Sequence, residues 1–387
     1  MDTTHFMATF QPLPFPLPLW LMQVLLVAGL YLHALPMNVI LGGGFLCSAL
    51  FLASKGERDT FAFRAARALT MALPVFISFA ITQGIVPLLF VQLVYGPAFY
   101  TSSIVMAVPW LLVVFIVMAS YYLSYLVIYK ILKKEHDATT AFSSALYIML
   151  MAIGFAAVGW IFTNNMTLML SPEKWSTLYQ ANSSGLHMNT NEPQLIPRYL
   201  HFFIAAISVA GMTLGCFGLY MRKREKDFSD WMIKVGSRVY LAATLWQIPV
   251  GLWFLRDIPA QYAQCFLGGD LPATIVFVVS MVLTLIAIAT AAMASSSASK
   301  PAFISALVTN ALVILTMIVN RHQLRSFYLD ERLKANLVPI QTQWDLLAIF
   351  LISTVALILY LVWLSRLVWS GYHPVKTETT LKETYGQ

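Results

Sequence analysis

The sequence predicts an all-α, polytopic membrane helical bundle of nine transmembrane helices, with the N-terminus outside and the C-terminus inside. Two observations predict this fold class. The chain contains nine long apolar runs, and about 20 apolar residues span the hydrocarbon core of a bilayer as a helix. The links between the runs alternate between rich and poor in Lys and Arg. None of the runs alternates as a strand would, and helices satisfy their own backbone polar groups in the membrane.

The nine runs take up most of the 387 residues. They are residues 20–54, 69–95, 102–129, 141–170, 199–221, 236–255, 272–294, 301–320 and 345–369. We therefore expect a single membrane domain over residues 1–370 and a polar cytoplasmic tail over residues 371–387. The net charge of +7 is concentrated in short links, where it suits anionic lipid. Nucleic acid is not an expected partner.

The basic residues predict the orientation. Of the 24 Lys and Arg residues, 17 follow the first, third, fifth, seventh or ninth run. Cytoplasmic loops carry the excess of basic residues, so these links are placed inside a cell inner (plasma) membrane. The outer link 171–197 is rich in Asn and Ser and is expected to be a loop. The outer link 321–344 has alternating charges that suit a surface helix.

Ionisable side chains within the membrane are few in this chain. Such groups are costly there and usually functional. No Asp or Glu lies in any of the nine apolar cores, which disfavours a proton-coupled pump. Three histidines, His33, His201 and His322, lie in the outer half of three different runs, with His322 closing the eighth. Three imidazoles at similar depth predict a cofactor site, which one alone would not.

Imidazole is the commonest protein ligand of haem iron, and His33 and His201 are the candidate ligands. Small residues along the faces of these two helices suit either a porphyrin or a closely packed helix. They are Met37, Ile40, Gly43, Gly44 and Cys47 on one face and Ala205, Ser208, Gly211, Met212 and Gly215 on the other.

Further residues are candidates for supporting roles. Arg321 and Arg325 lie one turn apart at the outer end of the eighth run, where they suit carboxylates such as haem propionates or anchor the helix at the interface. Met281 in the seventh run is a candidate axial thioether, or ordinary core filling. Six amides suit a quinone pocket or interhelical hydrogen bonds: Gln83, Gln92, Asn164, Asn165, Gln247 and Asn310.

Motifs of several other chemistries are absent from the sequence. There is no C-x-x-C-H motif for covalent c-type haem, no P-loop and no Rossmann fingerprint. Of three cysteines only Cys265 lies in an outer link, so no disulfide framework is expected.

The first run carries a motif with its own spacing. It reads His33-Ala-Leu-Pro-Met-Asn-Val-Ile-Leu41-Gly42-Gly-Gly-Phe45-Leu46. This resembles the first helix of cytochrome bd oxidase subunit I, in which a haem-ligating His is followed at the same distances by Leu-Gly and Phe-Leu.

The fifth run carries a second motif. Arg198-Tyr-Leu-His201 runs on to Gly215, Tyr220 and a basic cluster. This is similar to the fifth helix of the same family, whose His ligates the low-spin b haem. The family also has nine spans, an outside N-terminus and haems near the outer face.

The resemblance implies that His33 ligates a haem of the high-spin pair and that His201 ligates the low-spin haem, with Met281 as its second ligand. The chain departs from the family in three places. Its third run has no carboxylate for proton delivery, and the link between runs six and seven is short where the family has a quinol-binding loop. Asn320-Arg321-His322-Gln323 stands in place of the Gly-Arg-Gln-Pro-Trp signature, without the ligand Glu. Oxygen reduction is therefore not expected.

These features together predict a bd-like integral membrane haem b subunit of a respiratory, quinol- or quinone-linked electron-transfer complex. It would carry one to three haems b and deliver electrons to an outer acceptor, such as a c-type cytochrome or an iron–sulfur protein. One alternative is a haem-free quinone-binding anchor subunit, similar to the membrane subunit of polysulfide reductase. A small-solute transporter and a structural scaffold are alternatives from other classes.

Overall fold

The computed structural model describes residues 14–132 and 138–370. These residues form eleven α-helices and three short helical turns, named η1 to η3. The helices are α2 (Leu19–Ala53), α3 (Phe61–Val105), α4 (Ala107–Leu132), α5 (Ala138–Met169), α6 (Trp175–Ala181), α7 (Leu195–Met221), α8 (Lys226–Asp257), α9 (Ala260–Gln264), α10 (Leu271–Ser297), α11 (Lys300–Leu333) and α12 (Trp344–Ser370). The predicted tail 371–387 lies outside the described residues, so that prediction stands as it was made.

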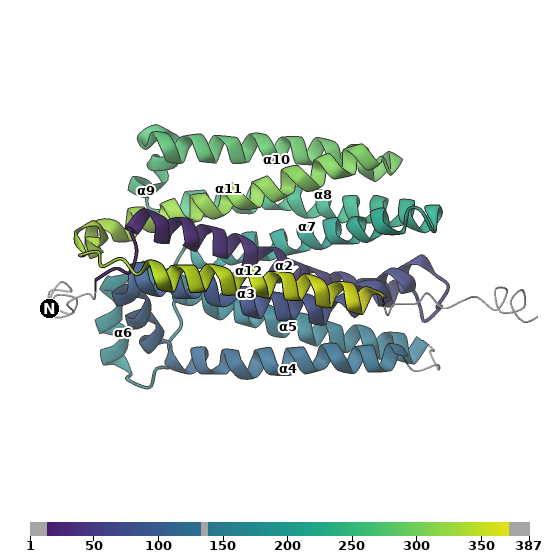
Figure 1. Ribbon diagram of the computed structural model, residues 1–387, viewed down its shortest axis with the longest axis horizontal. Coiled ribbons are helices and arrows are strands. Elements are labelled where there is room, and N and C mark those ends of the chain that lie inside the picture. The colour runs from purple at the N-terminus through teal and green to yellow at the C-terminus, as the bar shows by residue number, and fades with distance from the viewer. Residues whose placement is uncertain (1–13, 133–137, 371–387) are drawn as a thin grey trace, which may run out of the picture.

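Nine of the described helices are long and lie side by side along one axis (Figure 1). The short helices α6 and α9 lie at one end of the bundle. Helix α2 begins at this same end, whereas α12 ends at the opposite one (Figure 1). Nine is an odd number, so the chain that begins at one end of the bundle with α2 finishes at the opposite end with α12.

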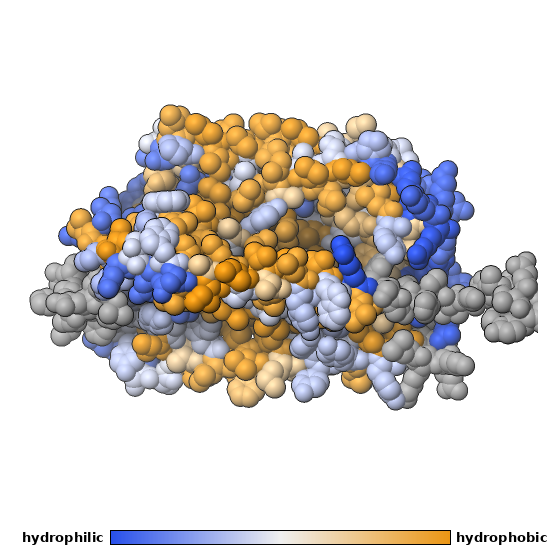
Figure 2. Space-filling view, in the orientation of Figure 1, coloured by the Kyte–Doolittle hydropathy of each residue, from blue (hydrophilic) through white to orange (hydrophobic). Residues whose placement is uncertain are grey.

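The described part of the chain is a polytopic membrane protein. Eight of its helices are long and apolar enough to cross a bilayer: α2, α3, α4, α5, α7, α10, α11 and α12. Helix α8 is equally long but carries charged residues through its first turns. Figure 2 shows hydrophobic side chains across the middle of one face and hydrophilic side chains gathered toward its ends. This is the distribution that a protein surrounded by lipid requires.

The boundaries of the second span differ from the prediction. The run 69–95 was expected to end in a link, but α3 continues through it from Phe61 to Val105. Tyr95 has non-helical backbone angles within this helix, with φ −121° and ψ 28°. It stands two residues before Pro97, which lacks a donor N–H and crowds the preceding turn. The predicted break is therefore a proline kink inside a helix.

The outer links contain more helix than the sequence predicted. The link 171–197 was expected to be a loop, but it contains η1 (Pro172–Lys174) and α6. The indole of Trp175 holds them by donating to the Leu168 carbonyl at 2.9 Å. The link 321–344 has no separate surface helix, because its charges lie on an extension of α11 that ends at Leu333, followed by η3 (Ala335–Leu337). The link 256–271 contains α9 and η2 (Cys265–Gly269).

Small residues set the closest helix contacts. Gly42 of α2 lies so near the main chain of α7 that a Cβ atom there would overlap the carbonyl of Ala206. Gly211 of α7 faces Gly236 of α8 in the same way, and Gly215 lies against the Phe303 ring of α11. These glycines allow backbones to approach closely. The interpretation of Gly211 and Gly215 as a porphyrin face is therefore wrong, and helix packing is their role.

The segment before α2 pairs with the segment before α12. The Phe15 N–H donates to the Pro339 carbonyl at 2.8 Å, and the Gln341 N–H donates to the Phe15 carbonyl at 2.9 Å. The pairing is an isolated parallel bridge between Phe15 and Ile340. It is a main-chain attachment for α12, the least buried of the candidate spans.

Replacing Gly42 by Ala is expected to destabilise the bundle by about 1–3 kcal/mol, because the added methyl group overlaps main-chain atoms that cannot move independently. Gly43→Ala is the matched control, since its Cβ would meet only Leu73 Cδ2 at 3.7 Å. The thermal unfolding midpoint in detergent measures both. Equal unfolding midpoints for the two variants would contradict the close contact of α2 with α7 at Gly42.

Candidate functional site

His33 lies in α2 with its imidazole against α3. Its Nδ1 donates to the carbonyl of Ala80 at 2.8 Å. The ring fits against Gly84, where a Cβ atom would come within 3.0 Å of its Cε1 and Nδ1. Because Nδ1 carries the proton, Nε2 keeps its lone pair, and no hydrogen bond occupies it within the described residues. This is the second-shell arrangement that orients histidine ligands.

His201 lies in the second turn of α7 with its ring against α8. A Cβ atom on Gly251 would stand 3.3 Å from its Cε1. Its Nδ1 is buried and has no hydrogen-bond partner within the described residues. Gln247 of α8 donates to the His201 main-chain carbonyl at 3.3 Å. His201 thus repeats the feature of His33, because its ring also rests on a glycine of the next helix.

His322 lies inside α11 and does not close it. The helix was expected to end near this residue, but it continues to Leu333, about 16 Å further along the axis. The Nδ1 of His322 is buried without a partner within the described residues. Its neighbour Arg321 lies within electrostatic range of His33, so α2 and α11 bring predicted site residues together.

Three arginines converge between α5, α7 and α11. Arg198, Arg321 and Arg325 line one small cavity of about 10 Å³, whose remaining walls are Met166, Leu170 and Leu324. A cavity of this volume holds about one water molecule. The structure therefore brings together the predicted pair Arg321 and Arg325 and adds Arg198. The three histidines are not among the residues that line this cavity.

No carboxylate forms an ion pair with these arginines in the described part of the chain. Arg198 donates to the neutral Gln194 Oε1 at 3.1 Å, and its Nε has no partner. Arg325 is 7 % exposed and stacks over the Tyr95 ring, with 5.6 Å between the guanidinium carbon and the ring centroid. The nearby Glu192 is paired with Lys174 at 2.7 Å. The cluster is an uncompensated concentration of positive charge.

Polar side chains from the link 171–197, which is predicted to lie outside, contact α5 and α11 next to this region. Gln194 Nε2 donates to the hydroxyl of Tyr328 on α11 at 2.8 Å. The Asn189 N–H donates to Asn164 Oδ1 at 3.0 Å, and Asn189 Nδ2 donates to the Thr167 hydroxyl at 3.2 Å. We call Asn189, Gln194 and Tyr328 the outer roof. It ties the link to α5 and α11, and its Gln194 also accepts a hydrogen bond from Arg198.

Two other residues that the sequence singled out, Met281 and Gln83, lie in different environments. Met281 on α10 is 38 % exposed, and the neighbouring Ser280 is buried and accepts a hydrogen bond from Asn320 of α11 at 3.1 Å. Met281 is thus not brought toward the histidines. Gln83, beside Gly84 on α3, is 3 % exposed, and neither atom of its amide has a partner within the described residues.

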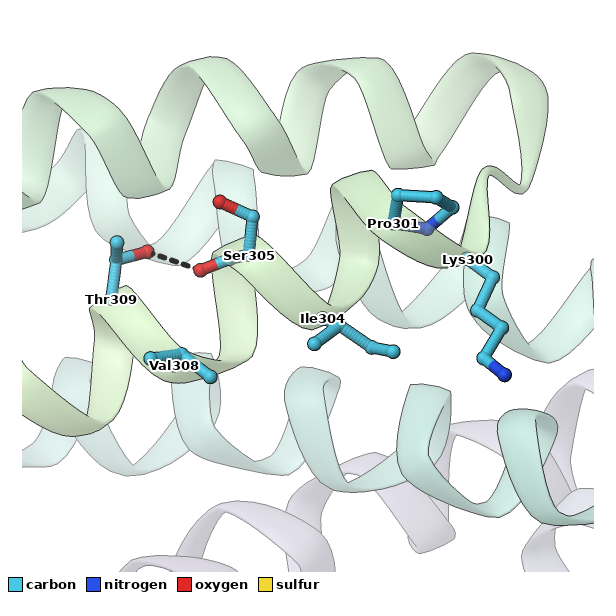
Figure 3. A pocket seen from close by; sticks show the side chains of 6 residues that line it. All are labelled: Lys300, Pro301, Ile304, Ser305, Val308 and Thr309. Atoms are coloured by element: carbon cyan, nitrogen blue, oxygen red, sulfur yellow. Dashed lines mark hydrogen bonds between the residues drawn. The ribbon is translucent and has the colours of Figure 1, made fainter.

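A second hollow lies on the N-terminal half of α11, apart from the histidines. It is an open groove of about 660 Å³ lined by Lys300, Pro301, Ile304, Ser305, Val308 and Thr309. Figure 3 shows the Thr309 hydroxyl donating to the Ser305 carbonyl, at 2.7 Å, so this polar group is already satisfied. The groove offers mostly apolar contact and no ligand for a metal ion.

The described residues contain no group of three or more His, Cys, Asp or Glu side chains that could hold a metal ion. A haem iron needs only one or two protein ligands. The candidate site is therefore a set of separate imidazoles with an arginine cluster.

Comparison with solved structures identifies the fold. The bd oxidase from Geobacillus thermodenitrificans superposes with a TM-score of 0.73, over 93 % of this chain and 100 % of that chain, at 12 % sequence identity. The chain has the bd oxidase fold. No protein-family profile matches the sequence, and no curated protein matches it. The predicted distant resemblance to bd oxidase is confirmed at the level of the fold.

The structure shows two supporting features that the sequence did not predict. Gly84 and Gly251 make room for His33 and His201, but a glycine in an apolar run carries no sign of the side chain it faces. Arg198 stands one turn before His201, and that spacing was a usable signal. Its convergence with Arg321 depends on the packing of α7 near α11, which no local pattern encodes.

Replacing Tyr328 by Phe is expected to destabilise the outer roof by about 1 kcal/mol, because Gln194 loses a buried hydrogen-bond acceptor. The Phe ring keeps the contact with Tyr262, whose centroid lies 4.0 Å away. Tyr179→Phe, on the exposed face of α6, is the control. Hydrogen exchange of residues 186–195 should rise in the first variant alone. Unchanged hydrogen exchange of residues 186–195 in Tyr328→Phe would contradict a stabilising role for the outer roof.

Proposed function

We propose that this protein is a haem-b-bearing subunit of a membrane electron-transfer complex that handles quinol or quinone. The observation that carries the proposal is His33. Its Nδ1 is fixed by the Ala80 carbonyl, its ring is seated on Gly84, and its Nε2 is left without a hydrogen-bond partner. The bd oxidase fold, found at 12 % identity, supports the proposal.

The residues of the outer half suit a haem in separate ways. His33 would hold iron through Nε2, and the Ala80 carbonyl would keep the ring oriented and the ligand basic. His201 would hold a second haem, with the wall of α8 behind its ring. Arg321 and Arg325 would bind propionates, since guanidinium groups pair well with carboxylates. Haem b, when bound, supplies one-electron exchange.

Two predicted ligands have less support. Met281 faces outward from α10, and no contact supports it as an axial ligand. His322 has an unpartnered Nδ1 next to Arg321, which suits a role beside the cofactor. Helix α4 carries no carboxylate, and we do not propose oxygen reduction. Electrons from quinol would leave at the outer face for a c-type cytochrome or an iron–sulfur partner.

A haem-free, quinone-binding anchor subunit is the second candidate. The Gln83 amide favours it, because this side chain is buried on α3 without any hydrogen-bond partner in the described residues. A quinone carbonyl would accept from its Nε2, and a quinol hydroxyl would donate to its Oε1. The two candidates differ in colour, since only the first contains haem.

The reduced-minus-oxidised visible spectrum of the purified protein tests the haem. We expect bands of b-type haem, and His33→Ala should remove one haem's contribution because no other group replaces Nε2. His201→Ala should remove another. His187→Ala, on an exposed loop, is the control.

The thermal midpoint and the elution volume of each variant are measured together with its spectrum, and only variants that match the wild type in both are interpreted. Loss of the fold is then not mistaken for loss of a ligand. A colourless wild-type protein, isolated from cells that load other b-type cytochromes, would exclude the haem proposal. That result would leave the quinone anchor as the function.

The nine-span topology, with the N-terminus outside and the plasma membrane as the location, belongs to the same proposal. Helix α8 would be the remaining span. Residues 239–255 contain no charged side chain, and Leu245, Trp246 and Leu252 are all more than half exposed, as lipid contact requires. The charged first half of α8 would stand in the cytoplasm.

Reporter fusions test this topology. Green fluorescent protein fused to the C-terminus is expected to fluoresce, because nine spans from an outside N-terminus end in the cytoplasm. Alkaline phosphatase inserted after Asn182 should be active in the outer compartment. A dark C-terminal fusion combined with an active C-terminal phosphatase would mean that α8 does not cross.

A further inference from the structure

Three positive charges at the outer end of the bundle lack a counter-ion. Arg198, Arg321 and Arg325 share one cavity, and each lies on a helix that crosses the membrane. Their described contacts are a neutral amide oxygen and two aromatic rings, Phe254 beneath Arg198 and Tyr95 beneath Arg325. A ring face attracts a cation but leaves its net charge in place.

Arg325 is buried and Arg198 is half-buried. An unpaired charge removed from water is unfavourable, and like charges close together repel each other. Proteins bury arginine where a carboxylate or phosphate pairs with it. The acidic groups nearby do not fill that role, because Glu192 is held by Lys174 at 2.7 Å and Asp330 forms no ion pair with these arginines in the described residues. The Nε–H of Arg198 also remains unsatisfied.

We propose that Arg198, Arg321 and Arg325 form a binding site for one small anionic group, a carboxylate or a halide. The cavity of about 10 Å³ is the size of a single water molecule, which limits the occupant to one oxyanion end or one monatomic ion. Its apolar walls, Met166, Leu170 and Leu324, offer no competing acceptor. Gln194 of the outer roof contacts Arg198 at 3.1 Å, while Arg321 retains an exposed side chain.

Two sources offer this chemistry. A free anion would enter past Arg321, whereas a propionate would reach the cavity from a haem bound nearby, since Arg321 lies within electrostatic range of His33. The second source rests on the function proposed above, but the site itself does not. In both cases Arg198 takes part in binding, and it belongs to α7, one turn from His201.

The test uses formate as the probe on the full-length protein in detergent, with gluconate replacing it at constant ionic strength. Protein produced with haem synthesis suppressed is compared with protein produced with haem. In the haem-free sample we expect the thermal midpoint to rise with formate and to saturate, because a ligand that binds only the folded state stabilises it. Arg321→Gln should weaken the apparent affinity about tenfold or more, since it removes a charge-assisted hydrogen bond.

Arg321→Lys keeps the charge and should retain most of the response, which separates binding from a folding defect. Arg332→Gln is the matched control, because Arg332 lies further along α11 at the surface and pairs with Glu173 at 3.3 Å. Its formate response should equal that of the wild type.

The protein produced with haem distinguishes the two sources of the anionic group, a free anion and a haem propionate. A formate response that disappears on haem loading identifies a propionate as the natural occupant, and a response that persists identifies a free anion. If the protein binds no haem at all, the proposed function fails while the haem-free arm still tests the anion site. A midpoint that does not respond to formate in the haem-free wild type, or that responds equally in Arg321→Gln, overturns the site.

Discussion

The crossing of α2 and α7 is the contact on which the geometry of the outer half depends. At Gly42 and Ala206 the two helices meet through main-chain atoms, with no side chain between them. This contact sets the separation of the helices that carry His33 and His201. Since association of helices within lipid relies on close packing rather than on exclusion of water, a methyl group at this point would move both imidazoles relative to each other.

The imidazoles themselves are positioned by the next layer of helices. Helix α3 provides the Ala80 carbonyl and the space at Gly84 for His33, and α8 provides Gly251 for His201. The pairs α2–α3 and α7–α8 therefore act as two similar units, joined at the α2–α7 contact. The difference between the units lies in hydrogen bonding, because His33 Nδ1 donates to the Ala80 carbonyl at 2.8 Å, whereas no hydrogen bond of comparable length holds His201 Nδ1 in the described residues. We expect the two rings to differ in rigidity for this reason.

The fold was largely predictable because the membrane imposes long apolar runs that hydropathy detects directly. The prediction was wrong where the end of an apolar run was taken as the end of a helix: α3 continues past Tyr95 to Val105, and α11 continues past His322 to Leu333. The site was predicted only in part. The hydrogen bond between Gln194 and Tyr328 joins residues 134 positions apart, and no local sequence pattern indicates such a contact.

The bridge between Phe15 and Ile340 has a consequence for biosynthesis. The segment that precedes the first described helix emerges from the ribosome early, and its pairing partner directly precedes the last one. The two segments can meet only after helices α2 to α11, which lie between them, have been translated. Final closure of the bundle is therefore a post-translational step, and a chain truncated before α12 would leave the insertion machinery with its opening segment unpaired.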